Sequence, residues 1–329
     1  MELYVDVAGQ YRDFADYARG DSPCFEEWAL RVADDPDVLA WIGDLPPAKQ
    51  QPNLVFAAAR RHGVRAPGPY DGLRTALLTD DGTIRSTILE RSTQTNEVGR
   101  LATITPVLAG IQQASGRPLA LVEAGASAGL CLLPDRVGYE WRTDRGTFRA
   151  LPDRGSPLTL PCDVTGHAPL PEAVPEVAWR RGVDLNPLDV RDDAAMAWLT
   201  NLVWPEQHER RARLVTAIDL ARADPPTLVR GNLLDELPAL VEEAREHGEV
   251  VVFHSAVIAY LSPQERDRFQ QLMADLVGRG GCHWVSNEGP QVLPSVAVPG
   301  RAPAGMFVLG VDGRAVAWAH GHGRALSWL

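Results

Sequence analysis

The sequence lacks several features that mark particular classes of protein. Its apolar runs are too short to cross a bilayer, so we expect no transmembrane helix and no membrane partner. Its first residues carry no basic segment followed by an apolar run, so we expect no secretory signal and a cytoplasmic location. Lysine is scarce, and 43 acidic residues against 32 Lys and Arg leave a net charge of -11. Such an acidic chain disfavours nucleic acid as a partner.

Cysteine is also rare, and no two cysteines form a Cys-x-x-Cys pair. We therefore expect buried free thiols rather than two disulfides. No cluster of His, Cys and Asp has the spacing of a metal site, so we predict no metal; His320 and His322 share one strand face, which alone is a weak signal. The four cysteines are Cys24, Cys131, Cys162 and Cys282.

What is present is an ordinary globular composition, with 45% hydrophobic and 23% charged residues in a chain of 329. Residues 1–116 show helical spacing: apolar side chains recur three and four positions apart from Tyr11 to Ala18 and from Phe25 to Val32. No stretch before residue 117 alternates as a strand does. We therefore predict a helical N-terminal region. The prolines that separate its helices are Pro23, Pro36, Pro46, Pro47 and Pro52.

From residue 117 onward, short apolar runs alternate with helical stretches, which favours a mostly parallel sheet covered on both faces. The predicted strands are 119–124, 177–185, 226–232, 249–257 and 282–288, and the predicted helices are 204–223, 235–248 with Gly248 as C-cap, and 262–280 with a Ser262–Glu265 capping box. Asp312-Gly313 within 305–321 predicts a closing antiparallel hairpin. We thus expect two domains, 1–116 and 117–329, the second with an insertion at about 139–176.

The stretch EAGASAG, residues 123–129, allows two interpretations. Gly-x-Ser-x-Gly is typical of a hydrolase nucleophile elbow, which would make Ser127 a nucleophile with Asp235, His254, His320 or His322 as partners. Pro134, however, would cut the following helix after about one turn, and no oxyanion loop precedes the strand. The alternative is a cofactor loop, in which small residues let the backbone approach a ligand. Its residues would be Glu123, Gly125, Ala126, Ser127 and Gly129.

Polar residues at later strand ends favour the cofactor interpretation, because ligands bind outside the carboxyl ends of parallel strands. An acid at the end of the second strand commonly binds ribose hydroxyls. Each residue also has a simpler interpretation, as a turn, a helix cap or a core histidine. The candidates are Asp184, Asn186, Asn232, His254 and Ser255.

The order of these motifs resembles a class I S-adenosylmethionine-dependent methyltransferase. The resemblance implies a Rossmann-like fold with a seven-stranded sheet whose last strand is antiparallel, and S-adenosylmethionine as cofactor. It implies Asp184 as the ribose ligand, with Asp144 as a competitor. More closely, the chain is similar to a largely actinobacterial family known only as a domain of unknown function. The motifs of that similarity are QTNEVGR (94–100), EAGASAGL (123–130), DLNPLDV (184–190), LVWPEQ (202–207), FHSAVIAYL (253–261) and WVSNEG (284–289).

Two further polar segments are candidates for the substrate side. Gln94, Thr95, Asn96 and Glu97 precede an apolar helix, and the alternative is that Thr95 or Asn96 merely caps it. WVSNEG ends the fifth strand, where the alternative is a simple turn. We predict His254 and Glu288 as candidate bases. The predicted substrate-binding residues are Gln94, Thr95, Asn96, Glu97, Tyr260 and Asn287.

The sequence therefore predicts a methyltransferase that uses S-adenosylmethionine on a small molecule, as a monomer or homodimer, with the N-terminal helices and the insertion as a lid. One alternative is a degenerate Rossmann-like protein that binds a ligand or partner without catalysis, because Ser127 stands where the usual loop has glycine. A second alternative is a serine hydrolase that uses Ser127.

Overall fold

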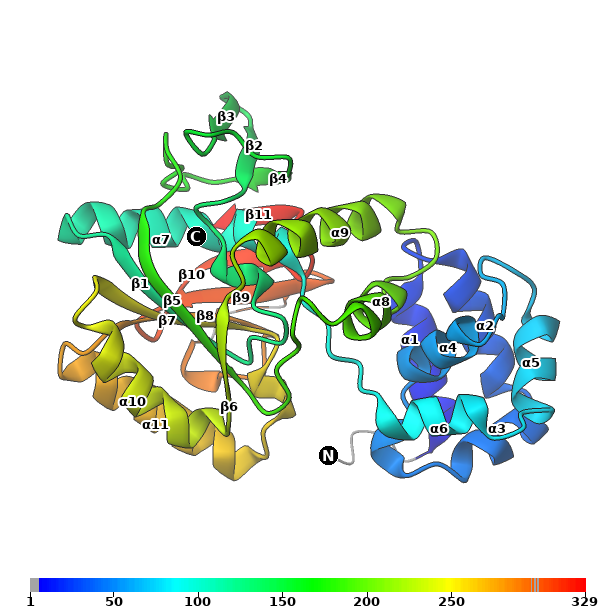
Figure 1. The fold of residues 1–329 in the computed structure, drawn as a ribbon. Coiled ribbons are helices and arrows are strands. Elements are labelled where there is room, and N and C mark those ends of the chain that lie inside the picture. The colour runs from blue at the N-terminus through cyan, green and yellow to red at the C-terminus, as the bar shows by residue number, and fades with distance from the viewer. Residues whose placement is uncertain (1–5, 297, 299, 301) are drawn as a thin grey trace. The chain divides into compact units, whose positions relative to one another are not determined.

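A computed structural model describes residues 6–296, 298, 300 and 302–329. It divides into two compact units (Figure 1). Unit 1 comprises the described part of Met1–Thr95 together with Asp193–Ala212, and unit 2 comprises Asn96–Asp192 and the described part of Arg213–Leu329.

Unit 1 is helical, as predicted, and it has no strand among the residues described. Three of the prolines that punctuate the sequence, Pro23, Pro36 and Pro52, are the first residues of helices, where the missing N–H costs nothing. The helices are α1 (Val7–Ala18), α2 (Pro23–Ala33), α3 (Pro36–Gly43), α4 (Pro52–Arg61), α5 (Tyr70–Leu78), α6 (Thr83–Glu90) and α8 (Asp193–Asn201), and α9 (His208–Ala223) begins here.

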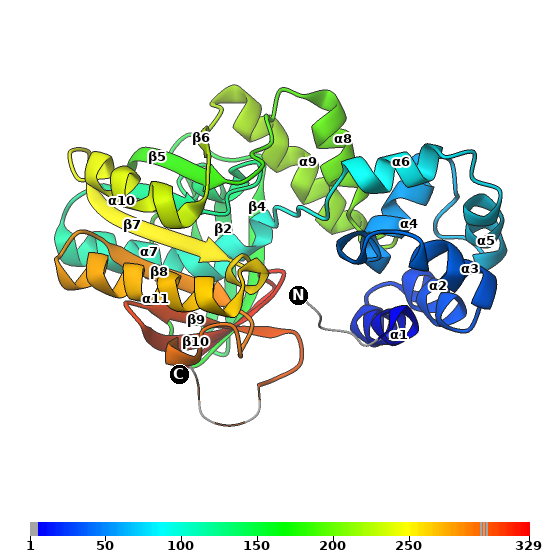
Figure 2. The ribbon, with the colours of Figure 1, turned by 90° about the horizontal axis from the view of Figure 1, so that it is seen from below.

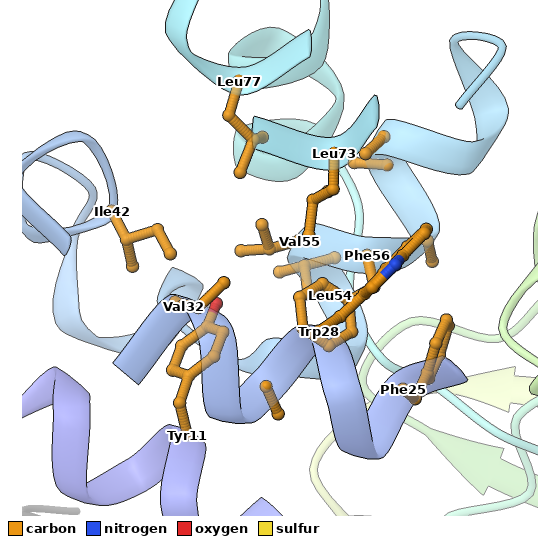
Figure 3. Packing of buried hydrophobic residues seen from close by; sticks show 14 of the residues in the cluster. Tyr11, Phe25, Trp28, Val32, Ile42, Leu54, Val55, Phe56, Leu73 and Leu77 are labelled. Carbon is orange, nitrogen blue, oxygen red and sulfur yellow. The ribbon is translucent and has the colours of Figure 1, made fainter. Parts of the chain in front are cut away.

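An aromatic cluster forms the core of unit 1 (Figure 3). The ring of Phe56 lies 5.0 Å from that of Phe25 and 5.4 Å from that of Trp28, both edge-on. Trp204, from the LVWPEQ motif, packs on the same cluster. Glu206 accepts hydrogen bonds from the Ser22 hydroxyl and the Cys24 N–H, at the start of α2. This motif therefore has a structural role within unit 1.

Unit 2 is built on one sheet of eleven strands in the order β3-β2-β4-β11-β10-β9-β8-β7-β1-β5-β6. All five strands predicted from apolar runs are present, as is the hairpin at Asp312–Gly313, formed by β9 and β10. The strands are β1 (Leu119–Ala124), β2 (Gly138–Thr143), β3 (Gly146–Ala150), β4 (Thr159–Thr165), β5 (Val177–Asp184), β6 (Thr227–Arg230), β7 (Glu249–Ser255), β8 (His283–Glu288), β9 (Met306–Val311), β10 (Arg314–His320) and β11 (Ala325–Trp328).

The sheet is mixed rather than a seven-stranded, mostly parallel one. Strands β6, β5, β1, β7 and β8 are parallel neighbours, and β9, β10 and β11 follow as antiparallel ones. The predicted insertion supplies the difference, because its strands β2, β3 and β4 extend the same sheet beyond β11.

Helices cover both faces of the parallel part (Figures 1 and 2). α10 (Leu233–Ala244) and α11 (Pro263–Gly278) pack together on one face, over a core that includes Val122, Val252 and Trp284. α7 (Leu101–Ser115) packs against β7 and β8 and also against β2 and β4. The sheet therefore curves around α7, and the Trp141 indole N–H donates to the Ala102 carbonyl at 2.8 Å.

The structure tests the predicted helix caps and the state of the cysteines. The Ser262–Glu265 capping box is confirmed. All four cysteines are buried and unpaired, as predicted. Gly248 is not the C-cap of α10, because the helix already ends at Ala244; a Cβ at Gly248 would lie 2.3 Å from the Pro118 carbonyl oxygen, so close packing explains this glycine. Among the helices of the described residues, none is both long and apolar enough to cross a bilayer.

The helix α7 lies in unit 2, whereas the described residues before Asn96, together with 193–212, form unit 1. The sequence groups α7 with the preceding helices because all share an amphipathic period. In the structure α7 belongs to unit 2, since its apolar side chains are buried against the strands.

A charged pair joins the β9–β10 turn to the start of β8. One oxygen of Asp312 accepts a hydrogen bond from His283 Nδ1 at 2.8 Å, and the other accepts the Trp284 N–H at 2.8 Å. The hydrogen bond to Asp312 raises the pKa of His283 above 6.5, although partial burial opposes it. Burial alone would raise the pKa of Asp312, but the bonds from His283 and Trp284 lower it below 3.8.

We therefore expect this pair to stabilise the fold most between pH 3.8 and 6.5. The His283 contribution is complete below its unfolded pKa and is lost as pH rises through the raised folded value. The Asp312 contribution is lost as pH falls through its lowered folded value. Urea unfolding at several pH values should show His283→Gln losing more stability at pH 5.5 than at pH 9. The exposed His167→Gln is the control, and equal losses at both pH values would contradict the expectation.

Candidate functional site

The candidate site lies at the carboxyl edge of the parallel strands in unit 2. β1 lies between β5 and β7, and the chain passes from β1 to β5 on one side and later returns to β7 on the other. Crevices outside the strand ends form at such a reversal of strand order. The structure brings four predicted residues to this edge, one from each central strand: Glu123, Asp184, Ser255 and Asn287.

The glycine loop after β1 lies against the end of β5. Gly125 and Gly129 have φ of 71°, a conformation that favours glycine, and Ser127 has φ of 53°. The N–H groups of Gly125 and Ala126 donate to the Val183 carbonyl at 2.8 and 3.1 Å. A Cβ at Gly182 would lie 2.4 Å from the Ala126 side chain, so β5 needs glycine where the loop crosses it.

Asp184 connects the glycine loop to the turn that follows β5. Its Oδ2 accepts the Ser127 N–H at 2.8 Å and its Oδ1 accepts the Asn186 N–H at 2.8 Å. The carboxylate therefore holds both backbone segments that border the strand ends. Its two hydrogen bonds to backbone N–H groups also orient it rigidly, as a ligand-binding acid requires.

No α-helix follows the glycine loop. The chain forms only the 3-10 turn η3 (Leu130–Leu132) before Pro134, as the position of that proline predicts. A helix N-terminus at a glycine loop is what attracts phosphate groups in dinucleotide-binding folds. The glycine loop here therefore lacks the helix N-terminus that holds a pyrophosphate in those folds.

Buried oxygens without hydrogen-bond partners gather at this edge. They are Glu123 Oε2, Ser127 Oγ and Asn287 Oδ1, with Glu288 Oε2 at the end of β8 on the opposite face of the sheet, and all four residues are at most 5% exposed. Buried polar atoms are rarely left unpaired in native proteins, because each costs about 1–3 kcal/mol. Burial, reinforced by the nearby Asp184 carboxylate, raises the pKa of Glu123 well above 4.5, against the opposing effect of Arg100.

Backbone strain is found at the same place. Ser127 and Ala256 have φ of 53° and 57°, and they lie in the loops that follow β1 and β7. Among the described residues, Asp312 is the only other non-glycine residue with positive φ. Strained backbone conformations are found mainly at binding and catalytic sites. They persist only where the contacts of the surrounding structure hold the backbone in place.

His254 and Glu288 form a closed pair on the opposite face of the sheet, under α11. His254 Nδ1 lies 2.7 Å from Glu288 Oε1, and its Nε2 accepts the Trp284 indole N–H at 3.0 Å. Glu288 Oε1 also accepts the N–H groups of Val257 and Ile258. His254 is 0% exposed and both of its ring nitrogens are engaged, so the geometry favours a structural role over the predicted role of base.

The segment 96–100 makes hydrogen bonds to the end of the glycine loop, to the end of β7 and to the turn after β10. Asn96 Oδ1 accepts the Leu130 N–H at 2.8 Å, directly after the glycine loop. Glu97, rather than Thr95 or Asn96, caps the following turn through the Gly99 N–H. Arg100 donates from Nε to the Gly321 carbonyl at 2.8 Å and from Nη1 to the Ser255 carbonyl at 3.0 Å.

Sequence reasoning missed Arg100 as a site residue, although QTNEVGR contains it. The signal was the neighbouring Gly99, whose added Cβ would lie 2.6 Å from the His322 carbonyl oxygen. A Cβ at Gly323 would lie 1.9 Å from the Gly99 carbonyl oxygen. The backbones at Gly99 and at residues 322–323 are therefore in direct contact, and this contact fixes the position of Arg100.

The remaining predicted residues serve local structure or lie away from this group. Asn232 is the N-cap of α10 and accepts the Leu234 N–H, and Asn186 accepts a hydrogen bond from Arg230. Tyr260 is 66% exposed on the turn η4 (Ile258–Tyr260). Gln94 and Thr95 belong to unit 1. Asp144 lies in the β2–β3 turn. Because β2 runs antiparallel to β8, this turn is at the opposite edge of the sheet from Asp184.

Neither a serine triad nor a metal cluster is assembled in the described part of the chain. The Ser127 hydroxyl is buried and no histidine bonds to it there. Within the same residues, no three or more His, Cys, Asp or Glu side chains are grouped to hold a metal ion.

A cavity of about 270 Å³ adjoins the glycine loop. Its walls are Ala128, the segment 187–191 that follows Asp184, and residues 225–228 before and within β6. Prolines and leucines are among its lining residues, but its exposed lining is more polar than apolar, and Asp189 and Arg191 belong to it.

One comparison with known proteins identifies a family. The family model described as "Uncharacterized protein conserved in bacteria (DUF2332)" matches residues 8–328, so the chain belongs to that family. No curated relative and no solved structure matches the chain.

Proposed function

We propose that this member of an uncharacterised bacterial family binds S-adenosylmethionine at the carboxyl edge of β1 and β5 and methylates a small molecule. One observation is the main support for the proposal: the Asp184 carboxylate accepts a hydrogen bond from the Ser127 N–H of the glycine loop. This contact lies between β1 and β5, where the strand order of the five parallel strands reverses. The finer fold assignment, a Rossmann-like methyltransferase fold, belongs to the same proposal. The parallel set followed by antiparallel β9 supports it.

The chemistry of the donor set suits this cofactor better than a dinucleotide. S-adenosylmethionine carries a positively charged sulfur with a transferable methyl group, an amino-acid part with an ammonium and a carboxylate group, and a ribose diol, and it has no phosphate. The edge supplies acidic groups and unpaired oxygens, and it lacks a helix N-terminus behind the glycine loop. Arg100, the cation of this group, donates to two backbone carbonyls.

Each residue has a defined part in this proposal. Asp184 would accept hydrogen bonds from the ribose hydroxyls while it holds the loop. Leu185, 72% exposed beside it, would offer an apolar surface to the adenine ring. Glu123 and Ser127 would bind polar groups of the methionine part through their unpaired oxygens. His254 would hold β7 and β8 in place rather than accept a proton.

Calorimetric titration with S-adenosylmethionine and S-adenosylhomocysteine tests the proposal. We expect micromolar binding of both and, at a hundred times the dissociation constant, a stabilisation of about 2.7 kcal/mol in thermal unfolding. NAD is the control ligand and should not bind, because no α-helix begins directly after the glycine loop to hold its pyrophosphate. Absence of S-adenosylmethionine binding at millimolar concentration would sink the proposal.

The same experiments separate the two alternatives. Binding without methylation of any offered acceptor would favour a degenerate ligand-binding protein. The strained φ of Ser127 is the one observation that favours a hydrolase. A fluorophosphonate probe that labels wild type but not Ser127→Ala would support it, whereas a methyltransferase should retain cofactor affinity in Ser127→Ala to within about tenfold.

A further inference from the structure

The β7–β8 side of the edge has a hydrogen-bond acceptor that nothing satisfies. Asn287 is 0% exposed, and its Nδ2 donates to the Ser255 hydroxyl at 2.9 Å. Its Oδ1 is buried and has no partner. Because the Nδ2 group is held by its hydrogen bond to Ser255, the amide plane is fixed. The unpaired Oδ1 therefore points in one direction, in which it can accept a hydrogen bond.

Asn287 lies on the same sheet face as Glu123. Asn287 is opposite Ser255 in β7, and Glu123 is opposite Phe253, two residues before Ser255. Side chains two residues apart on a strand share a face. In the strand order β8-β7-β1-β5, Ser255 and Asn287 lie on one side of Glu123 and Asp184 lies on the other. The pair is therefore next to the proposed cofactor residues but separate from them.

Two buried oxygens of this face have no hydrogen-bond partner. The Nε and Nη1 groups of Arg100 and the Asn287 amide N–H all donate within the protein. Unpaired oxygens remain on Asn287 and Glu123. A ligand oxygen placed against Asn287 Oδ1 would be a second acceptor without a donor between them, so the complementary group is one that supplies N–H donors.

We propose that the Ser255–Asn287 pair binds the amino group of a small-molecule amine, with Asn287 Oδ1 as its acceptor. The inference rests on the proposed function in one respect, namely that this amine would be the methyl acceptor. Binding of the amine itself does not depend on the cofactor.

The test uses three matched ligands, butylamine, 1-butanol and butyrate, titrated into the full chain and observed by ligand NMR. We expect butylamine to bind about tenfold more tightly than 1-butanol, and butyrate to show no binding, since a hydrogen bond from a charged donor is the stronger. Asn287→Leu should weaken butylamine about tenfold or more and leave 1-butanol nearly unchanged. Gln271→Leu, on the exposed side of α11, is the control and should bind as wild type does.

A second variant keeps the inference testable if Asn287→Leu does not fold. Asn287→Asp retains the shape and adds a negative charge, and the Ser255 hydroxyl can turn to donate to it. We expect Asn287→Asp to bind butylamine more tightly than wild type, which a merely structural role would not produce. Equal binding of all three ligands, or failure of butylamine to bind, would overturn the inference and assign the unpaired oxygen to an ordered water.

Cofactor titration of the same samples separates the two proposals. Binding of S-adenosylmethionine without binding of butylamine overturns the amine site alone. Binding of butylamine without S-adenosylmethionine supports the amine site and overturns the methyltransferase proposal.

Discussion

Replacing His254 by alanine should lower the free energy of unfolding by about 3–5 kcal/mol, because it leaves a cavity and a buried donor without a partner. The imidazole is completely buried and joins Glu288 to the Trp284 indole. After the substitution, the Trp284 N–H would face a cavity and Glu288 would lose one of the three donors at its Oε1. Urea unfolding followed by far-ultraviolet circular dichroism measures the change.

His247→Ala is the matched control. Its ring stacks on Trp179 with centroids 5.6 Å apart, but it is exposed, so we expect a loss below about 1 kcal/mol. If His254→Ala unfolded like wild type and lost only activity, His254 would be the base that the sequence predicts rather than a structural residue.

Replacing Asp184 by alanine should weaken S-adenosylmethionine binding about 100-fold or more, the loss expected for two hydrogen bonds to a charged group. The ribose would lose its acceptor, and the Ser127 and Asn186 N–H groups would lose the carboxylate that holds them. Asp184→Asn keeps one acceptor oxygen and should show an intermediate loss, about tenfold. Calorimetric titration of the three proteins provides the comparison.

Asp235→Ala serves as the control, because Asp235 is an exposed acid in the first turn of α10. It should bind the cofactor as wild type does. Equal affinity in Asp184→Ala and wild type would place the ribose elsewhere and remove the observation on which the proposed function depends.

Much of the fold was predictable from local pattern. The apolar runs ending in glycine or polar residues predicted all five parallel strands, since a strand buried on both faces is mostly apolar. This reason holds best for β1, β7 and β8, which are buried along nearly their whole length, whereas β5 and β6 are only partly buried. Ser262, Pro263 and Glu265 marked the start of α11 because a helix start needs caps for its free N–H groups. The strands and the start of α11 both depend on residues that are close together in the chain, so the sequence predicts them directly.

The site was only partly predictable. Glu123, Asp184, Ser255 and Asn287 were all named as candidates, because residues at the carboxyl ends of parallel strands share an edge. The hydrogen bonds that assign their roles were not, since Asp184 bonds to Ser127 across 57 positions and Arg100 bonds to Gly321 across 221. Contacts at such separation depend on strand order, which the chain's local pattern does not encode.

The sequence by itself determined that this is a chain of helices followed by an α/β sheet with a small-residue loop after its first strand. Only the tertiary structure decided that the insertion strands join the far end of the same sheet, and that α7 packs inside its curve. Only the tertiary structure separated His254, sealed between Glu288 and Trp284, from Asn287, which keeps an unpaired oxygen. The physical reason is that a side chain's type sets which hydrogen bonds it can make, while the groups that long-range packing places around it decide which ones it does make.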